Sequence, residues 1–73
     1  MATYRYLVIL EKGPHNYGVY APDLPGCVST GATPQEALKN MHEAIALHLE
    51  GMLQDGDPIP EAVSTADYVE VTL

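Results

Sequence analysis

The chain has 73 residues and a mass of 7.9 kDa, enough for a single domain over residues 1–73 and too few for a two-lobed enzyme. Ten Asp and Glu residues against three Lys and Arg residues give a formal charge of −7, which disfavours direct binding to nucleic acid or anionic lipid and favours a basic protein partner. The single cysteine, Cys27, excludes an intrachain disulfide, and no signal-peptide pattern opens the chain, so we expect a cytoplasmic location. A core this small favours self-association.

The first part of the chain predicts three strands joined by turns. Residues Thr3–Glu11 are rich in aromatic and β-branched side chains, which is typical of a strand. A short polar loop separates them from a second strand at Tyr17–Ala21 and favours an antiparallel hairpin. Leu24-Pro25-Gly26-Cys27 has the pattern of a type II turn, because proline presets φ and glycine accepts a positive φ. The turn leads into a third strand at Cys27–Thr30.

One helix follows. In Thr33-Pro34-Gln35-Glu36 we expect Thr33 to be the N-cap, Pro34 to occupy the first helical position and Glu36 to close a capping box. Asp55-Gly56-Asp57-Pro58 ends the helix, with Gly56 as a left-handed cap. Apolar residues recur at helical spacing on the side that should face the sheet: Ala37, Leu38, Met41, Ala44, Ile45, Leu49 and Met52.

The last segment predicts a final strand. Asp67–Leu73 alternates apolar and polar residues, which should place Val69, Val71 and Leu73 inward. The element order is therefore β-β-β-α-β. This order indicates an α+β fold, in which one helix packs on one face of an antiparallel sheet.

Two sets of residues are candidates for protein contacts. Glu36, Glu43 and Glu50 are spaced by seven and lie away from the apolar stripe, with Leu47 beside them. This face is either an ordinary solvated surface with one stray Leu or a docking surface for a cationic partner. Tyrosines on the predicted strands either complete the core margin or form an interface between copies, and we expect the interface at Tyr4, Tyr6, Tyr20 and Tyr68.

Catalytic and metal-binding patterns are incomplete. His42-Glu43 begins an H-E-x-x-H pattern, but Ala46 stands where the second histidine is required, and His48 lies on another side of the helix. Cys27 could act as a nucleophile only if the fold brought His15 or His42 beside it. We therefore expect no enzymatic activity, no metal and no cofactor.

Nearly the whole chain resembles the HicB family of antitoxins. The resemblance is carried by Tyr20–Cys27 (YAPDLPGC), Gly31, Thr33–Ala37 (TPQEA), the helix through Leu49 and the later Asp57–Glu61 (DPIPE). It implies a partial ribonuclease-H-like β-β-β-α-β fold without the acidic catalytic cluster of true ribonucleases H. It also makes the segment from Asp23 to Cys27 a structural turn and, through Asp23, a candidate contact loop.

The resemblance implies a function as well. A HicB antitoxin binds HicA, a small basic ribonuclease with a double-stranded-RNA-binding-like fold, and blocks its cleavage of mRNA. Many members carry a further DNA-binding domain, and because this sequence stops at Leu73 we expect no direct binding to DNA. The alternative is a solitary HicB-like protein that acts as an oligomeric regulatory or assembly factor without a toxin.

Overall fold

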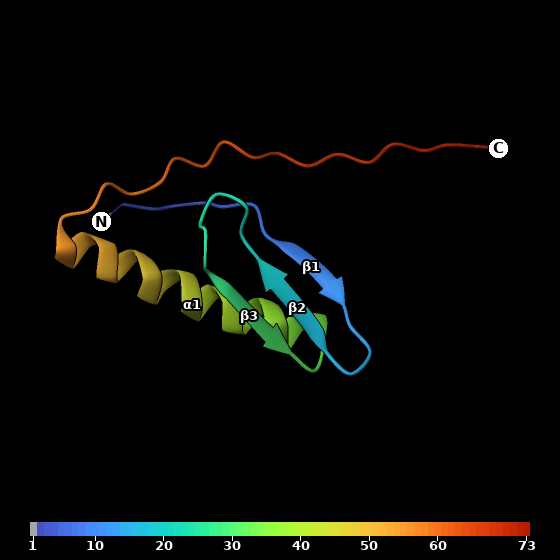
Figure 1. Ribbon diagram of the computed structural model, residues 1–73, viewed down its shortest axis with the longest axis horizontal. Helices are drawn as coiled ribbons and strands as arrows, with labels where there is room; N and C mark the ends of the chain where they lie inside the picture. The colour runs from blue at the N-terminus through green and yellow to red at the C-terminus, as the bar shows by residue number, and fades with distance from the viewer. Residues whose placement is uncertain (1) are drawn as a thin grey trace.

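The computed structural model describes residues 2–73, which form three strands and one helix: β1 (Ile9–Lys12), β2 (Tyr17–Tyr20), β3 (Val28–Gly31) and α1 (Pro34–Asp55). The strands make one antiparallel sheet in the order β1-β2-β3. Helix α1 packs across one face of this sheet, mainly over β3 and β2 (Figure 1). The predicted α+β class, with an antiparallel sheet and one covering helix, is confirmed.

Local sequence signals set the connections between the strands. The loop after β1 closes with a hydrogen bond from the Gly13 N–H to the Asn16 carbonyl at 2.7 Å, and the hairpin pairs Lys12 with Tyr17. Before β3, the Cys27 N–H donates to the Leu24 carbonyl at 3.1 Å. Gly26 lies in this turn with a φ of 82°, a conformation that glycine adopts without steric cost.

Both ends of α1 are capped by residues close in sequence. At the start, the Glu36 N–H donates to Thr33 Oγ1 at 3.1 Å, while Glu36 Oε1 accepts from the Ala32 N–H at 3.4 Å. At the end, Gly56 has a φ of 73° and its N–H donates to the Leu53 carbonyl at 3.3 Å. These contacts satisfy backbone groups that have no partner inside the helix.

The core lies between the sheet and α1. It combines side chains from β2, from the turn before β3 and from one side of the helix: Val19, Ala21, Leu24, Cys27, Ala37, Met41 and Leu49. Ala44, Ile45 and Met52 are half-buried and pack against this cluster. Leu38, which the helical spacing placed inward, is exposed, so the buried stripe is narrower than the sequence predicts.

Two strand predictions require correction. The first strand is shorter than predicted, since its bonded part is Ile9–Lys12 and residues 3–8 precede it as extended chain. The final strand predicted at Asp67–Leu73 is not formed, and Val69 and Val71 are exposed rather than inward. A strand needs the hydrogen-bonding edge of a neighbour, which alternation along the sequence does not supply. This segment instead runs away from the sheet as extended chain (Figure 1).

Candidate protein-binding site

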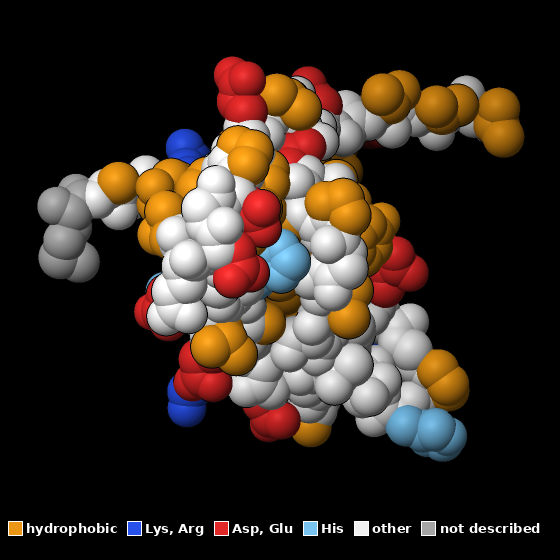
Figure 2. Space-filling view, turned by 60° about the vertical axis from the view of Figure 1, so that its left-hand side comes forward, with side chains coloured by type: hydrophobic (Ala, Val, Ile, Leu, Met, Phe, Trp, Pro, Cys, Tyr) orange, Lys and Arg blue, Asp and Glu red, His pale blue; other side chains and the backbone are white. Residues whose placement is uncertain are grey.

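The outer side of α1 carries an acidic surface with an apolar side chain in it. Glu43, Leu47 and Glu50 are all exposed, and Leu47 is exposed to 72%. We call these three residues the acidic face. Glu36 is also exposed, but its carboxylate accepts the capping bond from Ala32, so it contributes to the helix start as well as to the surface charge. Figure 2 shows acidic side chains spread over the molecular surface and few basic ones.

Asp23, predicted as a partner contact, has an intramolecular role. Its Oδ2 accepts hydrogen bonds from the backbone N–H groups of Ser64 at 2.9 Å and Val63 at 3.0 Å, and its Oδ1 accepts from Ser64 Oγ at 2.8 Å. These hydrogen bonds lower the pKa of the carboxyl below its ordinary value of 3.8, because they stabilise the charged form. The largest effect comes from the Ser64 N–H, followed by the Ser64 hydroxyl and then the Val63 N–H. Asp23 therefore ties the chain after α1 to the turn before β3.

The four tyrosines of the predicted interface lie in different settings. The Tyr6 hydroxyl donates to the Pro60 carbonyl at 2.6 Å, and burial, followed by the nearby Tyr4 and Asp23, raises its pKa. Tyr4 and Tyr20 are partly exposed, while Tyr68 is 98% exposed on the unpaired segment. Tyr4 and Tyr6 thus lie near each other on the chain before β1, whereas Tyr20 belongs to β2 and Tyr68 to the unpaired segment.

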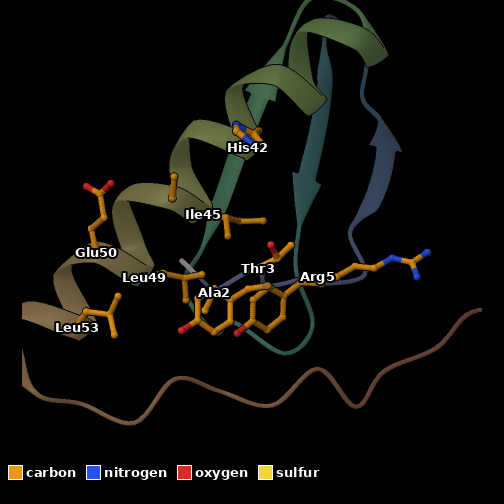
Figure 3. Close-up of a pocket in the computed structure, with 11 residues that line it drawn as sticks. Ala2, Thr3, Arg5, His42, Ile45, Leu49, Glu50 and Leu53 are labelled. Carbon is orange, nitrogen blue, oxygen red and sulfur yellow. The ribbon is translucent and has the colours of Figure 1, made fainter.

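A groove lies between the extended chain before β1 and the second half of α1 (Figure 3). It has a volume of about 750 Å³, and the helix contributes Ile45, Leu49 and Leu53 to its wall. Tyr4 and Tyr6 of the extended chain also line the groove. No local spacing in the sequence predicts this groove, because it arises from the packing of segments about 40 residues apart. Its lining residues are Ala2, Thr3, Tyr4, Arg5, Tyr6, His42, Ile45, Ala46, Leu49, Glu50 and Leu53.

The residues considered for catalysis lie in unfavourable settings. Cys27 is buried in the core, and burial raises the pKa of its thiol, which opposes formation of the reactive thiolate. His42 lines the groove and His15 is exposed in the loop after β1. Within residues 2–73, no three His, Cys, Asp or Glu side chains gather closely enough to hold a metal ion. In these described residues, no helix combines the length and the hydropathy that a membrane span requires.

Proteins with similar sequences match most of the length of this chain. An uncharacterized 14.9 kDa protein of Haemophilus phage HP1 is 42% identical over 64 residues, which are 88% of this chain and 48% of the phage protein. A UPF0150 protein of Synechocystis is 41% identical over 80% of this chain and 75% of its own length. A UPF0150 protein of Thermoplasma acidophilum is 40% identical over 77% of this chain and 83% of its own. The chain thus spans about half the length of its phage relative.

A solved structure and a family model point to the same group. A chain of the HicA3 and HicB3 toxin-antitoxin complex superposes with a TM-score of 0.70 and 32% identity, over 82% of this chain and 70% of that one. The model of the HicB-like antitoxin of bacterial toxin-antitoxin systems matches residues 6–72. With the sheet, the helix and the match through residue 72 in agreement, the chain belongs to the HicB-like antitoxin family.

Proposed function

We propose that this protein binds a small basic toxin of the HicA type and blocks its cleavage of mRNA, without catalysing a reaction itself. Family membership and the similarity to a chain of a toxin-antitoxin complex support this role. The formal charge of −7 suits a cationic protein and disfavours direct contact with DNA. Such neutralisation would take place in the cytoplasm.

The acidic face of α1 is the main support for toxin binding. Leu47 is 72% exposed between two carboxylates, on a helix whose other side is fixed in the core by Met41 and Leu49. Acidic residues speed encounter with a basic surface, and an apolar side chain among them gains free energy once a partner covers it. We infer that Leu47 is the central contact, with Glu43 and Glu50 on either side of it.

Growth rescue tests the contact surface. A HicA-type toxin is induced in cells that express this protein, and growth is followed. Wild type should restore growth, whereas the double variant Glu43→Lys/Glu50→Lys should fail, because two repulsive charges would face the basic toxin. Leu47→Asp should fail as well, because it places a charge where an apolar contact is expected.

The control is the double variant Asp57→Lys/Glu61→Lys. It carries the same net charge but changes exposed residues beyond the helix, and it should rescue growth like wild type. Equal rescue by both double variants would show that the acidic face is not the contact. Growth arrest despite abundant wild-type protein would instead favour the solitary oligomeric factor over the antitoxin.

We also propose that the protein self-associates. Exposed apolar side chains lie on the outer side of the sheet, at Tyr20 and Val28, and on the unpaired chain after α1, at Val69 and Val71. One helix covers only one side of this small sheet. A domain of this size gains stability when a second copy covers such surface.

A further inference from the structure

Residues 65–73, which we call the exposed segment, have the sequence pattern of a strand but pair with no neighbouring strand. The segment is extended and outside the sheet, and it runs past the body of the molecule (Figure 1). Tyr68 is 98% and Val69 is 87% exposed, and Val71 and Leu73 are exposed too. Its alternation is that of a strand with one buried face. The apolar side chains of the exposed segment are thus spaced for burial on one face, but no other part of the same copy covers them.

The dimensions of the molecule also indicate surface that is not covered within one copy. The radius of gyration is 14.2 Å, whereas a compact domain of this length has about 11 Å. The accessible surface is 5911 Å², whereas a folded monomer of this mass exposes about 4,400 Å². One copy therefore exposes on the order of 1,500 Å² more than a compact monomer, and two copies together exceed it by about 3,000 Å², which is within the range buried by obligate homodimers.

The outer edge of β1 can receive a strand. β1 has one neighbour in the sheet, β2, and α1 lies mainly over β2 and β3, which leaves Leu10 of β1 38% exposed on the helix side of the sheet. The other end of the sheet is less open, because Asn40 Nδ2 of α1 donates to the Thr30 carbonyl of β3 at 2.8 Å. An unpaired edge with exposed apolar side chains is the kind of surface to which a further strand adds.

Charge favours the exposed segment as that strand. Two of the three basic residues of the chain, Arg5 and Lys12, lie on the extended chain before β1 and in β1 itself, beside the acidic Glu11, so basic residues outnumber acidic ones there by two to one. The exposed segment carries Asp67 and Glu70. Opposite charges on neighbouring strands stabilise their pairing. In the acidic face, Glu43 and Leu47 are not among the residues that line the groove beside Arg5, whereas Glu50 is.

We propose that two copies of the chain exchange their exposed segments, each adding as a fourth strand along β1 of the other copy. The exchange is favoured over pairing within one copy because Asp23 holds Val63 and Ser64 and Tyr6 holds Pro60. From there the segment runs past the sheet and continues beyond it without pairing with its own β1 (Figure 1). Val69, Val71 and Leu73 then extend the core of the second copy beside Leu10. The exchange is independent of toxin binding, and its reciprocal form closes as a two-fold dimer.

Molar mass in solution tests the exchange. Wild type should be a dimer by light scattering at micromolar concentration, whereas Val71→Asp should be a monomer. The adjacent Thr72→Asp introduces the same charge on the opposite side of the strand and should remain a dimer. Because Val71 is exposed in each copy, the variant should keep the helical circular dichroism of wild type. A monomeric wild type, or a Val71→Asp variant that stays dimeric, would overturn the proposal.

A mixed dimer separates exchange from other modes of association. One copy is labelled with ¹³C and ¹⁵N and the other is unlabelled, and isotope-filtered NOEs are recorded. The exchange predicts NOEs between copies that connect residues 67–73 with residues 5–12. A dimer in which those residues show NOEs only within one copy contradicts it.

Discussion

Gly31 lies where β3 runs closest to the start of α1. A Cβ added at this position would lie 2.8 Å from Ala37 Cα and closer still to the Ala37 nitrogen. Ala37 is fully buried, so the backbones of strand and helix meet with no space for a side chain between them. Glycine is therefore required at position 31, one of the positions that resemble the HicB family, because the two backbones approach closely there and not because φ is unusual.

We predict that Gly31→Ala destabilises the protein, because α1 must move away from β3 to accommodate the methyl group. Overpacking of this kind costs about 1–3 kcal/mol. Urea denaturation at fixed protein concentration measures the change in the free energy of unfolding. Gly18→Ala in β2 is the matched control, since a Cβ there meets nothing within 4 Å. Equal stability of the two variants would show that the close approach does not constrain the fold.

At the scale of elements, the chain after α1 is held by a few polar contacts. Asp23 accepts three hydrogen bonds from Val63 and Ser64, and the Tyr6 hydroxyl donates to Pro60. These contacts join the turn before β3 and the chain before β1 to residues about 40 and 54 positions away in sequence. They fix the point from which the exposed segment leaves the molecule.

The contacts of Asp23 predict a pH dependence. Its folded pKa lies below the ordinary value of 3.8, so its stabilising contribution is complete above that value and is lost as the pH falls through the folded pKa. The amide NMR signals of Val63 and Ser64 should therefore hold steady from neutral pH to about 4 and move only in stronger acid. Asp23→Asn should abolish that acid transition. Amide signals that titrate with a midpoint above 3.8 would contradict the account.

Elements set by neighbouring residues could be predicted from the sequence, and elements set by distant partners could not. The turn at Gly26 and the helix ends at Thr33 and Gly56 follow from residues within four positions, and their hydrogen bonds lie where such residues place them. The predicted last strand did not form, because its pairing depends on an edge that alternation does not specify. The contact surface on α1 stays a prediction, since a partner can contact Leu47 only if it is exposed, but exposure does not identify the partner.

In the molecule as a whole, the two proposed contacts use different elements. The acidic face lies along α1, whereas β1 is the edge of the sheet that would receive the exposed segment of a second copy. A dimer formed by strand exchange would thus leave both acidic faces open to toxin. Since Glu43 and Leu47 are not among the residues that line the groove beside the chain before β1, variants of these two residues should leave the exchange intact, and their effects should add to those of Val71→Asp.

Calorimetric titration of the purified protein with a HicA-type toxin measures the binding on which the antitoxin function depends. We predict one toxin per chain and an affinity that falls as salt rises from about 50 to about 300 mM, because salt screens exposed charges. Glu43→Lys/Glu50→Lys should weaken binding about tenfold or more, equivalent to about 1.4 kcal/mol, and Asp57→Lys/Glu61→Lys should bind like wild type. No binding by wild type at concentrations of about 100 µM would contradict the antitoxin function.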